Sequence, residues 1–406
     1  MMLRLYAAAA GFAQPAFRRM LAKRAATGKE IPARLAEREG ISSLPRPDGK
    51  LAWVHAASVG ETMSVLPVLH ALAGQGAKIL LTTGTVTSAR LAESRLPPGA
   101  IHQFVPLDVP AWVERFLSHW QPDVAVFLES ELWPNLLRGC DAHGIPRLLI
   151  NARMSDKSAR NWRRAPGTAR ALLGGFAAVL AQSATDAAKF RSLSVEVQEW
   201  GNLKFFTAPL PVDQAALDTL KAQLPGPAWL AASTHEGEEE IIATAHENLL
   251  PQFPTLITII VPRHPERGEA VAALCGNAPR RSLGQPPIPG KIYVADTLGE
   301  LGLFFRATPF AFIGNSLVGF GGHNIIEPAL LARPALSGPH LENFKEPAEI
   351  LRDAGMLAEV TDAASLAAAA ASWLRACPDG AIAAACFASA AQLPLRVAGL
   401  IMGQIP

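Results

Sequence analysis

The sequence predicts an α/β protein with two doubly wound parallel-sheet domains that face each other across a cleft. Short apolar runs rich in branched residues alternate with longer alanine- and leucine-rich amphipathic segments. Strands that are apolar throughout and separated by helices are typical of parallel sheets covered on both faces. The pattern restarts once, after Phe206–Asp213, which holds two prolines and reads as a linker. At 406 residues the chain is long enough for two such domains.

The strand candidates form two series. In the first half they are Ala52–Ala57, Lys78–Thr83, Ile101–Pro106, Asp123–Leu128, Arg147–Asn151, Ala177–Ala181 and Val195–Trp200. In the second half they are Trp229–Ser233, Leu256–Pro262, Lys291–Ala295, Phe310–Gly314 and Pro334–Ser337. We expect domains over residues 31–207 and 208–385, and a C-terminal helix over 386–406 that packs back on the first domain.

Residues 1–30 are expected to associate with a membrane. The apolar run Leu5–Phe17 is bounded by Arg4 and by Arg18 and Arg19. About 20 apolar residues are needed to cross a bilayer, so a helix lying on an anionic membrane surface fits better than a span. A secretory signal and an ordinary amphipathic first helix remain alternatives.

Composition excludes several classes of protein. The formal net charge is +2 and only 18% of residues are charged, which argues against a nucleic-acid coat protein, so no nucleic-acid partner is expected. The four cysteines form no C-x-x-C pair, which fits a reducing, cytoplasmic setting. There is no P-loop, G-x-S-x-G, H-E-x-x-H or D-x-D motif, so we expect no metal and no cofactor, with cationic groups stabilising a leaving group.

Carboxylates follow two strands of the first half, where ligands bind in doubly wound sheets. Glu61 comes after "HAASVG", in the first turn of a helix, where it is either a general base or merely an acid that suits the helix dipole. Glu129 and Glu131 flank Ser130 directly after another strand, and they point the same way if that segment is extended.

Basic residues follow the next strands of the first half. Arg153, Lys157 and Arg160 lie in "NARMSDKSARNWRR", with almost no acid to balance them, and Lys204 stands alone in "GNLKFF". Such clustering at strand ends favours an anionic partner such as a phosphate, although a solvated charged face is the usual explanation.

The second half repeats this arrangement with glycines and further basic groups. Arg263, His264 and Arg267 suggest a phosphate clamp. In "GNSLVGFGGHNIIEPAL", the residues Gly319, Gly321 and Gly322 bring backbone N–H groups close to an anion, His323 and Asn324 cap a helix, and Glu327 accepts from ribose hydroxyls. In "ASTHEGEEE", Ser233 or Thr234 followed by acids predicts a capping box.

Seven motifs in register carry a resemblance to one family. "HAASVGE", "ESELWPN", "NARMSDKS", "GNLKF", "STHEGEE", "VPRHPER" and "GGHNIIEPA" together resemble the 3-deoxy-D-manno-octulosonic acid (Kdo) transferases of lipopolysaccharide biosynthesis, from about residue 50 to about residue 350. The resemblance implies a GT-B fold of two Rossmann-like domains. It also implies inverting, metal-independent transfer of Kdo from CMP-Kdo to the lipid A precursor, lipid IVA, at the cytoplasmic face of the inner membrane.

The resemblance also implies roles for single residues. Glu61 falls on the general base, and Glu129 and Lys204 fall on residues that assist the transition state. The CMP contacts fall on Pro262, Arg263, Leu298, Gly299, Glu300, Asn324, Ile325, Ile326 and Glu327. To these our own interpretation adds His264, Gly321 and Gly322 for the donor, and Ser58, Gly60, Arg153, Lys157 and Arg160 for an anionic acceptor.

This chain departs from the family pattern in places. Lys157 stands where arginine is usual, and Phe206 where aspartate is frequent. The alternatives are another GT-B glycosyltransferase or epimerase that uses a UDP-sugar, and a non-catalytic, membrane-peripheral nucleotide-binding protein. A comparison of the affinity for CMP with the affinity for UDP distinguishes the first alternative from a Kdo transferase. Glu61→Gln distinguishes the second, because this substitution would change nothing measurable in a non-catalytic protein.

Overall fold

The computed structural model describes residues 2–206, 210–319 and 321–405, and it divides the chain into two compact units. The N-terminal unit comprises Met1–Phe206 and Gln392–Pro406, and the C-terminal unit comprises Thr207–Ala391. The expected linker Phe206–Asp213 falls at this division, and residues 207–209 of it lie outside the described residues.

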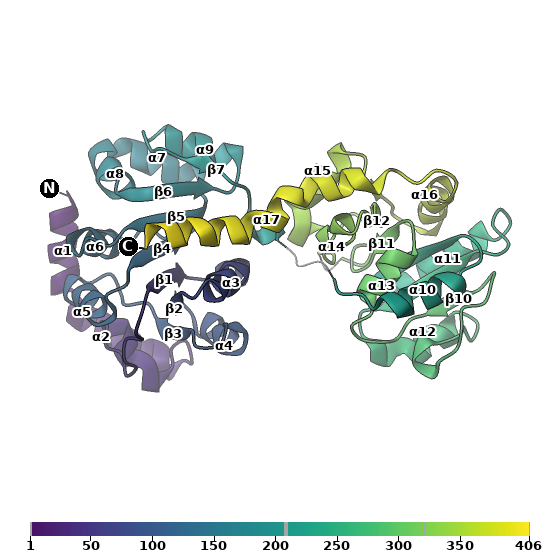
Figure 1. Cartoon of the computed structure of the whole chain (residues 1–406), viewed down its shortest axis with the longest axis horizontal. Coiled ribbons are helices and arrows are strands. Elements are labelled where there is room, and N and C mark those ends of the chain that lie inside the picture. Colours follow the sequence, from purple (N-terminus) through teal and green to yellow (C-terminus); the bar gives the residue numbers. More distant parts are fainter. Residues whose placement is uncertain (1, 207–209, 320, 406) are drawn as a thin grey trace. The chain divides into compact units, whose positions relative to one another are not determined.

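The N-terminal unit is a parallel sheet with strand order β3-β2-β1-β4-β5-β6-β7 (Figure 1). The strands are β1 Leu51–Ala56, β2 Lys78–Thr83, β3 Ile101–Phe104, β4 Val124–Leu128, β5 Arg147–Ala152, β6 Phe176–Ala181 and β7 Gln198–Glu199. Strand β4 is buried throughout, as a central strand covered on both faces requires. The first series of expected strands is therefore confirmed, with β3 and β7 shorter than expected.

Four α-helices of the N-terminal unit begin at a hydroxyl side chain, and four others begin with a proline in the first turn. The elements are α1 Met2–Phe12, α2 Gln14–Ala26, the 3₁₀ helix η1 Pro32–Glu39, α3 Val59–Gly74, α4 Val86–Arg95, α5 Pro110–Trp120, α6 Pro134–Ala142, α7 Asp156–Arg164, α8 Pro166–Leu173, α9 Ala184–Arg191 and η2 Leu203–Phe205. Ser58, Thr85, Ser155 and Ser183 each cap a helix that follows a strand. These caps fix where each helix starts, next to the carboxyl ends of β1, β2, β5 and β6.

The C-terminal unit repeats the design, with strand order β10-β9-β8-β11-β12-β13. Its strands are β8 Ala228–Thr234, β9 Ile257–Pro262, β10 Ile292–Val294, β11 Ala311–Ile313, β12 Ala335–Ser337 and β13 Leu357–Glu359. Its helices are α10 Gln214–Ala222, α11 Glu238–Leu249, η3 Pro265–Arg267, α12 Gly268–Leu274, η4 Arg281–Leu283, α13 Leu301–Ala307, α14 Ile326–Leu330, η5 Glu342–Phe344, α15 Lys345–Asp353, α16 Ala363–Arg375 and the start of α17 Gly380–Gln404. The sequence missed β13, because this edge strand is short and only its first residue is buried.

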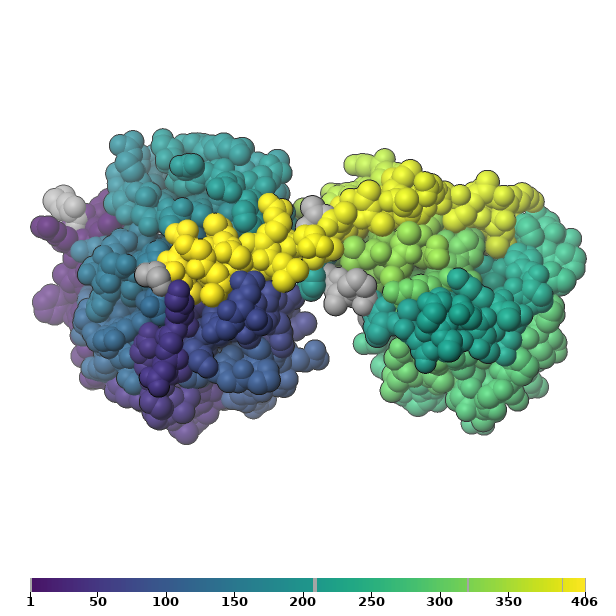
Figure 2. Space-filling model, viewed as in Figure 1, coloured from purple at the N-terminus to yellow at the C-terminus, as the bar shows by residue number. Residues whose placement is uncertain are grey.

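Helix α17 belongs to both units. Its last residues Leu393, Val397, Ala398 and Ile401 are buried in the core formed by one face of the N-terminal sheet and helix α3. Figure 2 shows this half of the helix, in yellow, lying in the surface of the N-terminal unit between the teal and dark blue segments. By length and composition α17 is also a candidate membrane span, but the packing of its C-terminal half explains its apolar character.

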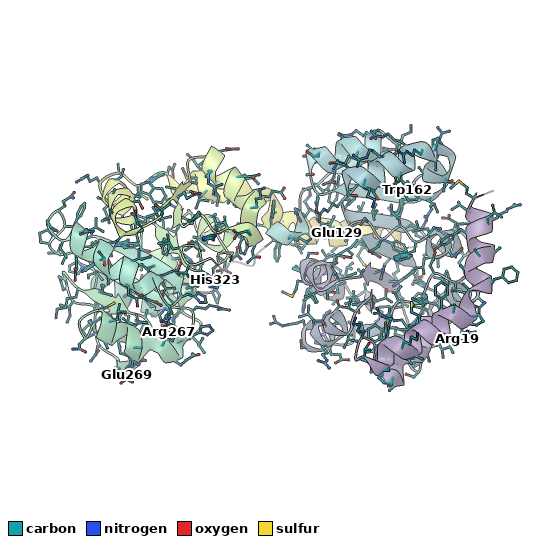
Figure 3. The ribbon with its side chains drawn as sticks, turned by 180° about the vertical axis from the view of Figure 1, so that it is seen from behind. Arg19, Glu129, Trp162, Arg267, Glu269 and His323 are labelled. Atoms are coloured by element: carbon teal, nitrogen blue, oxygen red, sulfur yellow. The ribbon has the colours of Figure 1, made fainter. Side chains whose placement is uncertain are left out.

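The N-terminal segment forms helices α1 and α2 rather than one continuous helix. The Tyr6 hydroxyl donates a hydrogen bond to the half-buried Asp108, which fastens α1 to the unit. Leu5 and Phe12 remain 62% and 87% exposed. On α2 the basic side chain of Arg19 is exposed as well (Figure 3). Exposed apolar and basic groups therefore coexist on this segment, as the expectation of membrane association requires.

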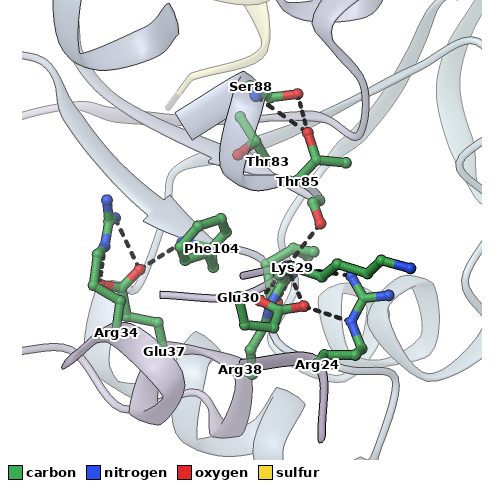
Figure 4. A network of polar contacts seen from close by, with 12 residues as sticks. Arg24, Lys29, Glu30, Arg34, Glu37, Arg38, Thr83, Thr85, Ser88 and Phe104 are labelled. Atoms are coloured by element: carbon green, nitrogen blue, oxygen red, sulfur yellow. Dashed lines mark hydrogen bonds and ion pairs between the residues drawn. The ribbon is translucent and has the colours of Figure 1, made fainter. Parts of the chain in front are cut away.

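A buried ion pair joins this segment to the sheet (Figure 4). Arg38 and Glu30 are 3% and 4% exposed, and the Nη2 atom of Arg38 lies 3.0 Å from a Glu30 carboxylate oxygen. Arg38 also donates to the carbonyl of Gly84, at 2.7 Å, beside the carboxyl end of β2. Its guanidinium lies 4.5 Å from the ring centroid of Phe104. One side chain therefore connects η1 with two loops of the sheet.

Removing one member of this pair is expected to destabilise the protein. Glu30→Gln leaves the Arg38 charge buried without its counterion, a defect that costs about 3 kcal/mol. Urea unfolding, followed by a tryptophan signal of the N-terminal unit, measures it. The pair of Arg34 and Glu93 in the same unit is the control, because the Glu93 side chain is 57% exposed and Glu93→Gln is expected to cost under about 1 kcal/mol. Equal effects of the two substitutions would contradict the assignment.

Candidate active site

In each unit the strand order reverses next to the first strand, between β1 and β4 and between β8 and β11. At such a point the helices that follow the two strands pass to opposite faces of the sheet, which leaves a crevice at the carboxyl ends. Most of the predicted site residues lie at these two edges.

Glu61 lies at the first of these edges, in the first turn of α3. Its carboxylate is 7% exposed, accepts from the backbone N–H of Ala57 at 2.9 Å, and accepts from the hydroxyl of Ser58 at 2.7 Å. Ser58 in turn caps the helix by accepting from the Glu61 N–H at 3.3 Å. The carboxylate is therefore held in one orientation by its own turn.

Burial raises the pKa of Glu61 above its ordinary value. The bonds from Ser58 and Ala57 oppose this rise, and the negative charges of Glu131 and Glu129 add to it. A raised pKa makes the carboxylate a stronger base, which a proton acceptor for a sugar hydroxyl needs. The same interactions show that the acids after β1 and β4 share one electrostatic environment.

Glu129 and Lys204 form an ion pair beside Glu61. The Lys204 Nζ atom lies 2.6 Å from a Glu129 carboxylate oxygen, and the lysine side chain is 40% exposed. Glu129 follows β4 in a left-handed conformation, with φ of 50° (Figure 3). Lys204 is placed by the turn after β7, where Asn151 accepts from the Leu203 N–H. The pair thus holds the partly exposed ammonium of Lys204 in a fixed place at the edge of the sheet, with its charge balanced by Glu129.

Glu131 has partners of its own rather than sharing those of Glu129. It accepts from Trp133 Nε1 at 2.5 Å and lies 3.3 Å from the Nε2 atom of the buried His55. Burial on its own raises the pKa of Glu131, but the bonds from His55 and Trp133 outweigh it and the pKa is lowered. A cavity of about 170 Å³ opens here, with Asp108 also in its lining. Glu131 therefore stays ionised and helps to shape this cavity.

The residues expected to bind an anionic acceptor are only partly gathered here. Ser58 and Gly60 adjoin Glu61, and the Arg153 N–H donates to the Glu129 carbonyl at 3.2 Å. Lys157 and Arg160 lie further along, on the exposed side of α7. No bond between these two and Glu61 or Glu129 is present among the described residues. The basic run thus leads from the site along the surface of α7.

In the C-terminal unit, glycines after β11 are required by close packing. A Cβ atom on Gly321 would lie 2.5 Å from Asn343, and one on Gly322 would lie 2.5 Å from Leu341. Both glycines, like Gly319, also have positive φ. The loop therefore needs glycine for its conformation.

The helix after this loop is short and only partly as expected. The N-cap residue of α14 is Ile325, which provides no side-chain cap. The side-chain oxygen of Asn324 accepts a hydrogen bond from the Ile326 N–H at 3.0 Å, and the ring of His323 turns to His235. Ile325 and Ile326 are buried. Glu327 accepts from Asn324 at 3.2 Å, and burial raises its pKa. Its carboxylate is thus held beside the loop by Asn324.

After β9, the residues of the expected phosphate clamp differ in their exposure. Pro262 ends the strand, and Arg263 is exposed close enough to act on the pKa values of both His323 and Glu327. His264 is exposed beside it. Arg267, which is labelled in Figure 3, pairs at 2.8 Å with the buried Glu239. Because a buried counterion holds its guanidinium, Arg267 is less available to an anion than Arg263, and its place in the clamp stays a prediction.

The turn after β10 places Leu298, Gly299 and Glu300 at the same edge of the sheet. Leu298 is 83% exposed, and Gly299 has φ of 82°. The Glu300 carboxylate accepts from Thr297 and from Arg281, the latter at 2.6 Å. These bonds lower the pKa of Glu300. The exposed leucine and glycine are the accessible part of this turn.

The capping box expected at Ser233 or Thr234 is wrong. Helix α11 begins after Gly237, and its first two acids, Glu238 and Glu239, are buried and bond to neighbouring loops. Glu238 accepts from the N–H groups of His235, Asn315, Ser316 and Leu317 at 2.7–3.0 Å. It thereby joins the loops after β8 and β11. Glu239 joins β8 to the β9 loop, since it accepts from the Thr234 hydroxyl and pairs with Arg267.

Sequence reasoning missed several residues at these edges. His55 lies inside an apolar strand, and only the pairing of β1 with β4 shows that it reaches Glu131. His235 was hidden in the apparent capping pattern. The signal for His55 was a histidine in a strand otherwise free of polar side chains. The signal for the loop that holds His235 was the run of three acids after Gly237.

The two parallel-sheet units have the GT-B fold. A crystal structure of MurG from Acinetobacter baumannii has a TM-score of 0.51 to this chain and 14% identity, and the match covers 87% of this chain and 100% of that one, which bears on the fold alone. A family model described as 3-deoxy-D-manno-octulosonic-acid transferase (kdotransferase) matches residues 33–207.

Curated relatives extend this match over most of the chain. A probable mitochondrial 3-deoxy-D-manno-octulosonic acid transferase of Arabidopsis thaliana is 35% identical, over 87% of this chain and 83% of its own. The 3-deoxy-D-manno-octulosonic acid transferase of Haemophilus influenzae is 33% identical, over 82% and 81%. The chain therefore belongs to the Kdo transferase family.

Proposed function

We propose that this chain transfers Kdo from CMP-Kdo to lipid IVA, the lipid A precursor, at the cytoplasmic face of the inner membrane. The observation that carries the proposal is the carboxylate of Glu61, which is buried, of raised pKa and fixed beside the ion pair of Glu129 and Lys204. Membership in the family supports the sugar that is transferred. The donor, the acceptor and the mechanism are the proposed part.

In the proposed reaction, Glu61 accepts the proton of an acceptor hydroxyl. The hydroxyl oxygen forms a bond to the anomeric carbon of Kdo on the side opposite the nucleotide, which inverts the configuration. The bond from that carbon to the phosphate oxygen breaks, and its electron pair leaves with CMP. Lys204 stabilises the negative charge of this step, while Glu129 holds the ammonium in place. No metal or cofactor is needed.

The C-terminal unit is proposed to hold the donor. Arg263 supplies an exposed positive charge for the phosphate, and the loop with Gly321 and Gly322 lets backbone approach it. Glu327 and Asn324 offer a held acceptor and donor for the ribose hydroxyls.

The N-terminal unit is proposed to hold the acceptor. Lipid IVA is an anionic lipid, and the exposed Arg153, Lys157 and Arg160 supply the opposite charge. The exposed apolar residues of α1, among them Leu5 and Phe12, fit a membrane surface.

The test is to incubate the protein with CMP-Kdo and tetraacylated lipid IVA and to weigh the lipid products. We expect a mass gain of whole Kdo residues that depends on CMP-Kdo, and the same masses report how many sugars are added. UDP-sugars serve as the control donors. A product formed from a UDP-sugar and none from CMP-Kdo would contradict the proposal.

A further inference from the structure

A pair of histidines joins the loops after β8 and β11 of the C-terminal unit and has no part in the reaction proposed above. His235 follows β8 and His323 follows the glycine loop after β11, so they come from the two strands where the order reverses. Their Nε2 atoms lie 3.0 Å apart. The ring planes are within 19° of each other and the centroids are 5.2 Å apart, so the rings meet edge to edge.

This contact fixes the protons of the neutral pair. One Nε2 must carry a hydrogen and the other must accept it, so one ring has a bare outer Nδ1 atom and the other has an Nδ1–H. Neither Nδ1 has a hydrogen-bond partner in the described part of the chain, and both rings are partly exposed. A further proton can therefore be bound at the bare Nδ1 without breaking the Nε2 contact. The pair then carries one positive charge and two outward N–H donors.

The surroundings of the two rings oppose this protonation. Burial, followed by the charges of His235, Arg263 and His264, lowers the pKa of His323 to about 4. Burial also lowers the pKa of His235, helped by His264 and Arg267 and opposed by Glu238 and Glu239. Those acids do not compete for the outer nitrogens, because Glu238 accepts from backbone N–H groups and Glu239 pairs with Arg267. An anion that binds next to the pair is expected to raise these pKa values, because its negative charge offsets the positive charges around the two rings.

We propose that His235 and His323 form an oxyanion-binding pair that takes up a proton as the nucleotide sugar binds. The inference rests on the proposed function, because the ligand in question is the donor. Two groups of that donor have suitable chemistry, namely the phosphate and the sugar carboxylate. The pair lies close to Arg263, which would share the same anion.

The experiment uses the full chain and measures the KM for CMP-Kdo and the accompanying proton uptake between pH 6 and 8, where the diester phosphate of CMP-Kdo does not titrate. The affinity for CMP is measured at pH 8, above the pKa of about 6 of its own phosphate. For the unchanged protein we expect proton uptake on binding and affinity that falls as the pH rises. His323→Gln and His235→Gln are expected to weaken binding about tenfold and to abolish the proton uptake. His323→Lys is expected to retain affinity but to lose the pH dependence, a result that a purely structural role does not produce.

The two ligands distinguish the two anions. If the glutamine variants bind CMP more weakly, the pair is assigned to the phosphate. If they bind only CMP-Kdo more weakly, the pair is assigned to the carboxylate. His70→Gln, an exposed histidine of the N-terminal unit, is the control, and thermal unfolding checks that each variant is folded. Unchanged affinity and proton uptake in both glutamine variants would overturn the inference while leaving the proposed function standing. If the unchanged protein bound neither CMP nor CMP-Kdo, the proposed function would fail, and the inference with it.

Discussion

Glu61→Gln is expected to lower kcat for Kdo transfer by about 10²–10⁴, the contribution of a general base. Glutamine keeps the shape and can still accept from the Ala57 N–H, but its amide cannot take a proton from a sugar hydroxyl. Affinity for CMP is expected to be unchanged, since Glu61 belongs to the N-terminal unit. The measurement is the turnover rate together with calorimetric binding of CMP.

The pH dependence of kcat is a second test of the role of Glu61. Because the pKa of Glu61 is raised, the base is protonated at low pH, and kcat is expected to rise with pH through a midpoint above the ordinary 4.5 of glutamate. Ionised Glu61 is penalised by burial, so the substitution is expected not to lower the free energy of unfolding near neutral pH. Glu196→Gln, an exposed acid of the same unit, is the control. Retained turnover in Glu61→Gln would remove this residue from the mechanism.

Glu238→Gln is expected to loosen the glycine loop. The carboxylate accepts from backbone N–H groups of two loops, and an amide would turn an N–H₂ group toward some of those donors. Buried donors left without an acceptor cost about 3 kcal/mol. Hydrogen exchange of residues 315–317 is expected to speed up about 100-fold as a result, and CMP affinity to fall at least about tenfold.

The matched control is Glu240→Gln, which removes the same charge from the same first turn of α11 at an exposed position. We expect it to change neither exchange nor affinity. Equal protection of residues 315–317 in the two variants would show that Glu238 does not hold the loop.

The sheets could be predicted from sequence because buried parallel strands are apolar at every position. Strand β4 is such a case, with each residue fully buried. Strand β13 was missed because a three-residue edge strand carries no comparable signal. The start of α3 was predictable too, since Ser58 and Glu61 have the spacing of a cap.

The site could be predicted only where the signal is local. Glu61, Glu129 and Lys204 were found from their places after strands, and the structure brings them together. The interactions of Arg267 and Glu238 could not be predicted in this way, because each side chain bonds to a partner in another loop. A basic residue after a strand looks alike in sequence whether it faces a ligand or a buried acid such as Glu239.

Helix α17 has a consequence for how this protein is made. The apolar face around Val397 and Ile401 completes the core next to α3, yet it follows the whole C-terminal unit in the chain. The N-terminal unit therefore cannot finish folding before the C-terminal unit has been translated, and one side of its sheet stays uncovered until then. A fragment cut after Phe206 would keep that apolar surface exposed, so the N-terminal unit is expected to need the second half of α17 for its stability.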